Sequence, residues 1–199
     1  SIQTLASVIL LKIHRMTGIY KKINYIFLTE FTKDKFFYMN SASGKIVFPE
    51  KKSYIKPNFT YPLEKNMSNS IPFRRNYYIY VGRLEEIKGI DMIISAFSEL
   101  RYLELRIVGS GLLKYAENAK EYKNIKFLGQ LDRTELAKEL SGAKALIVAS
   151  QVYETFGMTI IEAFSCGIPA IVGNIGNIGA LVKDGITGFK FDFNKKDSL

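Results

Sequence analysis

The chain has 199 residues, 47% of them hydrophobic, and a formal net charge of +9. This length and composition allow one well-formed core and part of a second, and they argue against an intrinsically disordered chain. The single cysteine, Cys166, excludes a disulfide framework and a cysteine-based zinc site, and it suits a reducing, cytoplasmic setting. We interpret Cys166 as a small buried residue near a helix end.

The excess positive charge lies in the N-terminal part of the chain. Residues 1–75 hold 13 Lys or Arg against 4 Asp or Glu, whereas residues 76–199 hold 15 of each kind. The apolar run 5–11 is too short to span a bilayer. With the basic residues that follow, it suits peripheral contact with the inner, anionic membrane face, and a helix buried in a domain is the alternative. Nucleic acid binding is disfavoured, because no recognised binding motif accompanies the charge.

The first elements in chain order are predicted from hydrophobic spacing and turn residues. They are a helix, a strand, a second helix and a second strand, over 2–16, 24–28, 29–40 and 53–56. Prolines, asparagines and serines then gather between residues 61 and 75, and we place an interdomain linker at 66–76.

From residue 77 onward, strand patterns alternate with helical patterns. The strands are expected at 77–81, 103–108, 125–128, 144–149 and 170–172. Such alternation predicts a parallel sheet covered by helices on both faces. We therefore expect a doubly wound, Rossmann-like α/β domain over 77–199.

The segment 153–169 begins with a carboxylate, continues as a helical pattern and ends at Gly167. Glu154 precedes the predicted helix, and Glu162 lies in its second turn. Eight helical residues cover roughly 12 Å and place the two carboxylates on different faces, where they suit different parts of one extended ligand. The helix N-terminus between them favours an anion such as phosphate. The alternative is an ordinary helix capped by Glu154, with Glu162 in solvent.

Two further turns follow strand patterns. Gly82, Arg83 and Lys88 come after the first strand of this domain and suit a diphosphate clamp, because ligands of doubly wound folds bind at the carboxyl ends of strands. Solvated surface charges are the alternative. Gly109 and Gly111 follow the next strand and leave room for close backbone approach, although the third glycine of a dinucleotide fingerprint is missing.

These motifs, in this order, resemble the donor-binding half of glycosyltransferase family 4, the "group 1" retaining glycosyltransferases of GT-B fold. The matching text is VGRLEEIKGIDMIISAF, LRIVGSG, IKFLGQL, ALIVASQVYETFGMTIIEAFSCGIPAIV and VKDGITGF, within about residues 77–191. The resemblance implies that residues 1–65 close an acceptor-side Rossmann-like domain and that 77–199 bind a nucleotide-sugar donor. It also implies that the chain is part of a longer enzyme.

The resemblance further implies roles for individual residues. Arg83 and Lys88 contact the donor diphosphate and Glu154 lies near the transferred sugar, so these three are the expected catalytic residues. The expected donor-binding residues are Gly82, Gly109, Gly111, Gly129, Leu131, Phe156, Gly157, Met158 and Glu162. Among them, Glu162 is expected on the ribose hydroxyls, and backbone around Gly129 is expected to face the nucleobase.

One departure from the resembled pattern is clear. Where relatives usually carry Gly-Gly-x-Pro-Glu, this chain has Gly176-Asn177-Ile178-Gly179-Ala180. The acidic side chain is missing, so the part that this loop plays in donor orientation stays open.

Several catalytic constellations are absent from the sequence. His14 is the only histidine and lies far from these motifs, so a Ser/His/Asp hydrolase has no support. There is neither a Walker A loop nor an Asp-x-Asp pair, so we expect no metal and no cofactor, and the cations and the helix N-terminus then neutralise the leaving group. A glycosidase pair of carboxylates lies roughly 5–10 Å apart, which the spacing of the two glutamates disfavours.

We therefore predict a retaining, metal-independent glycosyltransferase. It would move a sugar from a nucleotide-diphosphate sugar to a glycan or lipid-linked acceptor, in cell-surface polysaccharide synthesis as the resemblance implies. GT-B-fold epimerases and phosphorylases share the architecture, and a fragment that binds donor without catalysis is a third reading. The sequence leaves the sugar, the nucleobase and the acceptor open.

Overall fold

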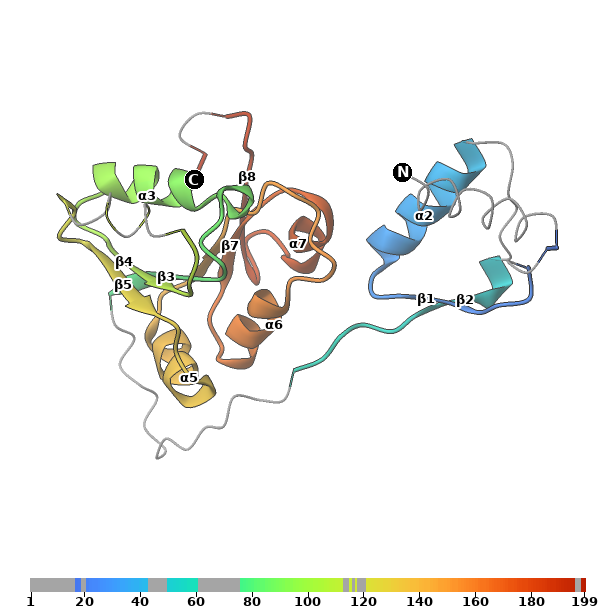
Figure 1. The fold of residues 1–199 in the computed structure, drawn as a ribbon, viewed down its shortest axis with the longest axis horizontal. Coiled ribbons are helices and arrows are strands. Elements are labelled where there is room, and N and C mark those ends of the chain that lie inside the picture. Colours follow the sequence, from blue (N-terminus) through green and yellow to red (C-terminus); the bar gives the residue numbers. More distant parts are fainter. Residues whose placement is uncertain are drawn as a thin grey trace, which may run out of the picture. The chain divides into compact units, whose positions relative to one another are not determined.

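The chain divides into two compact units, residues 1–58 and 59–199 (Figure 1). The computed structural model describes residues 17–18, 21–42, 50–60, 76–112, 115, 117, 121–195 and 198–199. The helix expected over 2–16, the apolar run 5–11 and nearly all of the expected linker lie outside the described residues. The two units are described separately below.

The described residues of the first unit form a small parallel sheet and a long helix. Strand β1 (Tyr25–Phe27) pairs in parallel with β2 (Ser53–Ile55), which follows the short 3-10 helix η2 (Glu50–Lys52). Helix α2 (Glu30–Ala42) begins after Thr29, whose hydroxyl accepts the backbone N–H of Thr32 at 3.1 Å. These elements confirm the strands and the helix predicted at 24–28, 29–40 and 53–56.

Aromatic side chains hold α2 against this sheet. The ring of Phe36 on α2 lies 5.6 Å from the ring of Tyr25 and 5.3 Å from that of Phe27 on β1. Ring pairs at such distances contribute beyond the area that they bury. These ring contacts therefore join helix α2 to strand β1.

The second unit is built on a six-stranded parallel sheet. In chain order its strands are β3 (Tyr77–Val81), β4 (Glu104–Val108), β5 (Ile125–Gly129), β6 (Leu146–Val148), β7 (Ala170–Gly173) and β8 (Gly188–Phe191). In space they lie in the order β5-β4-β3-β6-β7-β8. The doubly wound α/β prediction is confirmed, and β8 is a strand that the sequence patterns did not reveal.

Helices cover both faces of this sheet (Figure 1). The 3-10 helix η3 (Glu86–Lys88) leads into α3 (Ile90–Glu99) on one face. The other face carries α5 (Arg133–Gly142), α6 (Met158–Ser165) and the short α7 (Gly176–Leu181). Because successive strand residues point to opposite faces, the sheet supplies both cores.

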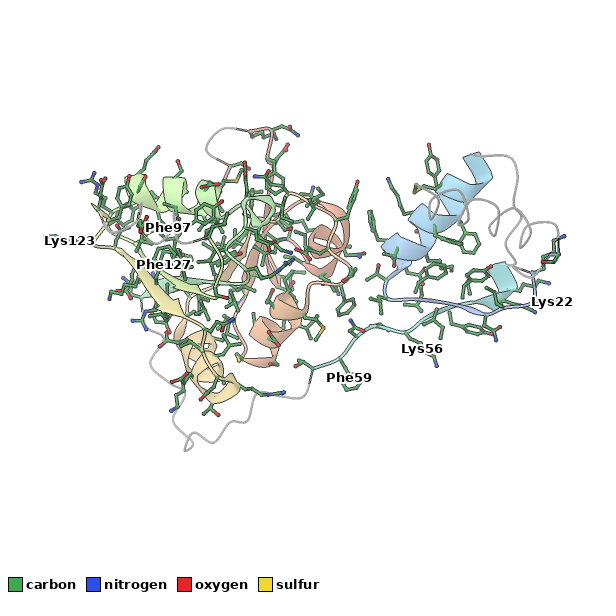
Figure 2. All side chains as sticks on the ribbon, in the orientation of Figure 1. Lys22, Lys56, Phe59, Phe97, Lys123 and Phe127 are labelled. Atoms are coloured by element: carbon green, nitrogen blue, oxygen red, sulfur yellow. The ribbon has the colours of Figure 1, made fainter. Side chains whose placement is uncertain are left out.

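The alternation is visible in β3. Ile79 packs in the cluster that contains Ile160 of α6, whereas its neighbour Tyr80 packs in the cluster that contains Ile93 and Phe97 of α3. Phe127 of β5 lies against the α3 cluster, on the same side as Phe97 (Figure 2). Both faces of the strands are therefore apolar, as parallel sheets require.

The strand order reverses between β3 and β6, and this reversal positions the site. From β3 the chain adds β4 and β5 on one side, and it then returns to place β6 against the other side of β3, with Ile79 opposite Leu146. At such a reversal the connections from the carboxyl ends of the two central strands diverge and leave a crevice. The segments after β3 and after β6 meet there.

Candidate functional site

A pocket of about 260 Å³ opens at this reversal of strand order. Its walls come from the end of β3 and the turn after it, from the end of β6 and the loop after it, from the start of α6, and from α7. The lining residues are Tyr80, Val81, Gly82, Arg83, Lys88, Val148, Ser150, Glu154, Thr155, Gly157, Met158, Thr159 and Ile178.

The turn after β3 carries Arg83. The hydroxyl of Tyr80 donates to the backbone carbonyl of Arg83 at 2.7 Å, and the N–H of Gly82 donates to the carbonyl of Val108 on β4 at 3.0 Å. Burial raises the pKa of the Tyr80 hydroxyl well above its ordinary value, and the nearby carboxylates add to the rise. Tyr80 is thus a neutral donor that holds the backbone of the turn in place.

The side chain of Arg83 lies mostly in solvent and is accessible to a ligand. Its guanidinium forms an ion pair with Glu85 at 2.6 Å, and the Arg83 side chain is 68% exposed. Exposed pairs of this kind contribute only about 0–1 kcal/mol. A phosphate can therefore replace Glu85 at little cost.

Gly89 brings Lys88 to the end of β6. Gly89 follows η3 with φ +69°, and a Cβ atom built there would lie 2.0 Å from the carbonyl oxygen of Ala149. A side chain at this position would push η3 away from β6. The N–H of Gln151 donates to the carbonyl of Ile87 at 2.9 Å and closes the same contact.

Lys88 and Glu154 form an ion pair inside the pocket. The Lys88 Nζ atom donates to Glu154 Oε1 at 2.6 Å, and the Ser150 hydroxyl donates to the same oxygen at 2.8 Å. The Lys88 and Glu154 side chains are 18% and 25% exposed. Burial by itself would raise the pKa of Glu154, but the hydrogen bonds from Lys88 and Ser150 and the charges of Lys88 and Arg83 together lower it below its ordinary value. Glu154 is therefore an anion at neutral pH.

Helix α6 begins at the pocket, as its sequence predicts. Gly157 precedes it with φ +90°, and no side chain caps the N-terminus. The first N–H groups and the positive end of the helix dipole thus lie beside Lys88, where they favour an anion. At the other end Gly167 has φ +71° and donates to Phe164, which confirms it as the helix stop.

Glu162 lies on α6 and does not line this pocket. It is partly buried, and burial raises the pKa of its carboxyl above the ordinary value, although the charge of Arg133 offsets part of the rise. In the described part of the chain, no hydrogen bond or ion pair to this carboxylate is present. The two glutamates therefore occupy separate surroundings, as their spacing predicts.

The structure brings six of the predicted site residues into one pocket: Gly82, Arg83, Lys88, Glu154, Gly157 and Met158. Phe156 belongs to the same loop, but its side chain is buried. Leu131 packs beside the core. The roles of all these residues toward a ligand stay predictions.

The predicted loop glycines lie beside the pocket and not in its wall. A Cβ atom at Gly109 would lie 1.8 Å from the carbonyl oxygen of Gly82, and one at Gly111 would lie 2.4 Å from that of Leu84. The close approach expected at these glycines is thus made by the chain's own backbone, which supports the turn that carries Arg83. Gly129 has φ +71° and accepts the N–H of Gly109 at 2.7 Å.

Sequence reasoning did not single out Tyr80, Ser150, Thr159 or Asn177. Ser150 stands directly after the strand pattern at 144–149, so its place at a strand end was a usable signal. Thr159 had a similar signal in the first turn of the predicted helix. The Tyr80 hydroxyl donates to the carbonyl of Arg83, three residues on, and the apolar strand pattern gives no sign of this contact. Asn177 donates to backbone carbonyls of a distant segment, which leave no trace in a local pattern.

A family model described as glycosyl transferases group 1 matches residues 64–199. The chain belongs to this family. The match includes the turn that carries Arg83 and Lys88 and the loop that carries Glu154, and it confirms the resemblance drawn from the motifs.

Named relatives match the same part of the chain. The glycogen synthase of Mycobacterium tuberculosis is 38% identical over 119 residues, which cover 55% of this chain and 28% of that protein. The D-inositol 3-phosphate glycosyltransferase of Mycobacterium leprae is 28% identical over 128 residues, or 59% of this chain and 30% of that protein. The chain thus spans less than a third of the length of these relatives.

Several solved structures share the fold. Sucrose-phosphate synthase from Thermosynechococcus elongatus is 25% identical, with a TM-score of 0.66 over 87% of this chain and 46% of that one. Anabaena Alr3699/HepE, solved in complex with UDP, is 18% identical, with a TM-score of 0.70 over 88% of this chain and 51% of that one. These likenesses confirm the predicted fold class.

Within the described ranges of the chain, no helix is both long and apolar enough to cross a membrane. Nor do three or more His, Cys, Asp or Glu side chains of those ranges gather where they could hold a metal ion.

Proposed function

We propose that this chain binds a nucleotide-diphosphate sugar in the pocket between β3 and β6 and serves a retaining, metal-independent glycosyl transfer. The observation that carries the proposal is the meeting of Lys88, from the turn after β3, with Glu154, from the loop after β6, at the reversal of strand order. Ligands of doubly wound folds bind at that place.

The positive groups of the pocket suit the diphosphate. Lys88, Arg83 and the uncapped N-terminus of α6 line the pocket and would stabilise the negative charge that grows on the leaving phosphate. These cations and N–H groups would neutralise the diphosphate charge, as a bound metal ion does in other enzymes. The departing nucleoside diphosphate would lie on the face where the acceptor attacks, as retention of configuration in this family implies.

The size of the pocket favours binding of one part of the donor. Its volume of about 260 Å³ lies below the roughly 300–1,000 Å³ of pockets that enclose a drug-sized ligand. It suits the diphosphate and the sugar, with Glu154 near the sugar. The nucleoside would extend toward Glu162 and the backbone around Gly129. UDP as the nucleotide is supported by the UDP complex of Anabaena Alr3699/HepE.

The acceptor is proposed to be a glycan or a lipid-linked glycan, and the setting cell-surface polysaccharide synthesis. Both rest on the family resemblance. Peripheral membrane contact through residues 5–11 and the basic residues after them is a further proposal, on residues that the structure does not describe.

Calorimetric titration tests donor binding. UDP-glucose and UDP, then the ADP-, GDP- and dTDP-linked hexoses, are titrated into the chain at up to about 1 mM, the weak end of usual substrate affinities. Saturable binding of a nucleotide sugar, weakened by Lys88→Ala, is expected. If no nucleotide sugar binds at that concentration, the proposal is wrong.

Proton NMR of the donor then identifies the reaction. Release or transfer of the sugar with the anomeric configuration of the donor supports a retaining transferase. Conversion of the bound sugar to an epimer, or transfer only to inorganic phosphate, would assign the chain to an epimerase or a phosphorylase instead.

A further inference from the structure

Asn177 is one of two polar side chains buried in the core of the described chain, at 2% exposure. It lies in the first turn of α7, and its Nδ2 atom donates to the backbone carbonyls of Glu154 at 2.8 Å and of Thr155 at 2.7 Å. Both hydrogen bonds cross more than twenty residues of sequence. A buried amide thus ties α7 to the loop after β6.

The anchored loop carries the polar groups of the pocket. The Glu154 carboxylate meets Lys88 and Ser150 within hydrogen-bond distance, and Thr155 also lines the pocket. The carbonyls of Glu154 and Thr155 lie outside helices and strands, so no ladder of hydrogen bonds holds them. The position of the Glu154 side chain therefore depends on what grips this turn.

Helix α7 also supports the next residues of the loop. A Cβ atom at Gly157 would lie 3.3 Å from side-chain atoms of Ile178 and Leu181, so the start of α6 already packs closely on α7. Ile178 lines the pocket itself. Asn177 thus acts from an element that contacts the loop at Glu154, Thr155 and Gly157.

This anchor lies in the stretch Gly176-Asn177-Ile178-Gly179-Ala180. The resemblance to group 1 glycosyltransferases implies a glycine where this chain has Asn177. Glycine has no side chain that could donate these two hydrogen bonds.

We propose that Asn177 is a positioning residue of the donor site: it fixes the turn at Glu154 and Thr155 so that the Glu154 carboxylate meets Lys88, and it thereby sets the affinity for the sugar part of a nucleotide sugar. This inference rests on the proposed function and assigns the loop of α7 a part in it. Asn177 acts through Glu154 and does not line the pocket itself.

The charge state of Glu154 reports the position of this turn. The groups that face its carboxylate are Lys88 and Ser150 by hydrogen bonds, Arg83 by its charge and the buried Tyr80 hydroxyl. The two hydrogen bonds from the Asn177 Nδ2 atom reach the backbone carbonyls of this turn and not the Glu154 carboxylate. A change in the pKa of Glu154 on substituting Asn177 therefore means that the carboxylate has moved relative to these partners.

The experiment compares two asparagines of the same unit. The Nδ2 atom of Asn124 also donates to backbone carbonyls, those of Phe97 at 2.8 Å and Leu103 at 2.9 Å. It directly precedes β5, at the amino edge of the sheet, opposite the pocket. Asn177→Ala and Asn177→Leu remove the donors with and without a loss of volume, and Asn124→Ala and Asn124→Leu are the matched controls.

The first measurement uses the chain without ligand. The pKa of Glu154 is followed by carbon NMR of labelled glutamate, with the signal assigned by its loss in Glu154→Gln. Both Asn177 variants are expected to raise this pKa toward the ordinary value, because the contacts with Lys88 and Ser150 weaken. The Asn124 variants are expected to lower the melting temperature and to leave the pKa of Glu154 unchanged.

The second measurement is the ratio of the affinity for UDP-glucose, or for whichever nucleotide sugar binds, to that for its bare nucleoside diphosphate. This ratio should fall roughly threefold to tenfold in the Asn177 variants, the size expected from one weakened hydrogen bond, and should stay constant in the Asn124 variants. A shifted pKa in a chain that binds no nucleotide sugar would support the anchoring of Glu154 and overturn the proposed function.

Three outcomes would overturn the inference. The first is a pKa of Glu154 that is equal in the Asn177 and Asn124 variants, which would make Asn177 an ordinary stabilising residue. The second is an unchanged affinity ratio in a chain that does bind the nucleotide sugar. The third is failure of both Asn177 variants to fold while the Asn124 variants fold, which would make Asn177 a determinant of folding.

Discussion

The loop that carries Glu154 and the helix that carries Glu162 belong to one short motif, yet they shift the pKa of a carboxyl group in opposite directions. Glu154 receives hydrogen bonds from Lys88 and Ser150, which lower its pKa. Glu162 is partly buried, and burial raises its pKa with only the charge of Arg133 to oppose the rise. The Glu154 carboxylate is hydrogen-bonded within the protein, whereas burial disfavours the charged form of Glu162.

This difference indicates how each glutamate would meet a ligand. No described residue donates a hydrogen bond to the Glu162 carboxylate, and a carboxylate in such surroundings gains from ligand hydroxyls, so the predicted contact of Glu162 with ribose stays a prediction. Glu154 already holds Lys88, so an incoming diphosphate competes with Glu154 for that cation. The sequence pattern alone treats both residues as acceptors of ligand hydrogen bonds.

The largest expected effect is that of Lys88→Ala. The substitution removes the cation that is proposed to bind phosphate, and it removes the ion-pair partner of the partly buried Glu154. Charge-assisted hydrogen bonds are worth about 1.5–3 kcal/mol, so the affinity for a nucleoside diphosphate should fall roughly tenfold to a hundredfold in calorimetry. Lys123 is exposed at the opposite edge of the sheet (Figure 2), so Lys123→Ala is the control and should leave this affinity unchanged. Unchanged affinity in Lys88→Ala would remove Lys88 from the site.

The two glutamates should then differ in nucleotide binding. Glu162→Ala is expected to weaken the bare nucleoside diphosphate about tenfold, because ribose hydroxyls lose a charged acceptor. Glu154→Gln should instead bind the bare nucleoside diphosphate as well as the parent chain or severalfold more tightly, because Lys88 is released, and should bind the full nucleotide sugar less well. Titration of both ligands into both variants measures this. Equal losses in all four titrations would show that the division of roles is wrong.

Stability should respond to the two glutamates with opposite signs. The lowered pKa of Glu154 means that its charge stabilises the fold above the ordinary glutamate pKa, and this contribution is lost as the pH falls through the folded value. The raised pKa of Glu162 means that its stabilisation is present below the ordinary pKa and is lost as the pH rises through the folded value.

Near neutral pH, Glu154→Gln should therefore lower the free energy of unfolding by about 1 kcal/mol, and Glu162→Gln should raise it slightly. Thermal melts from neutral to acid pH measure both, and the deficit of Glu154→Gln should vanish in acid. A deficit that persists in acid would point to lost packing in place of a lost charge.

The smallest effect is expected from metal removal. Because Lys88, Arg83 and the N-terminus of α6 are proposed to neutralise the diphosphate, EDTA should leave the affinity for a nucleoside diphosphate unchanged. The same titration repeated with added magnesium is the control. A loss of affinity with EDTA that magnesium restores would contradict the proposal of metal independence.

Local patterns in the sequence determined the elements and most of the candidate site. The run Tyr77–Val81 forms β3 with the predicted bounds, because a short, continuous apolar run is typical of a strand buried on both faces. Gly157 and Gly167 bound α6, because each adopts a positive φ that other residues rarely accept. Arg83, Lys88 and Glu154 could be selected from their places at the predicted ends of strands.

The tertiary structure decided which of these pieces meet. Three contacts join segments that are distant in the sequence. Strand β6 lies beside β3, Lys88 pairs with Glu154 across 66 residues, and Asn177 holds the turn at Glu154. The sequence predicted close backbone approach at Gly109, and only the fold shows that the backbone of Gly82 makes this approach. Periodicity and turn residues act over a few positions and specify the type of each element. Strand order and hydrogen bonds to distant carbonyls arise only when the whole sheet packs.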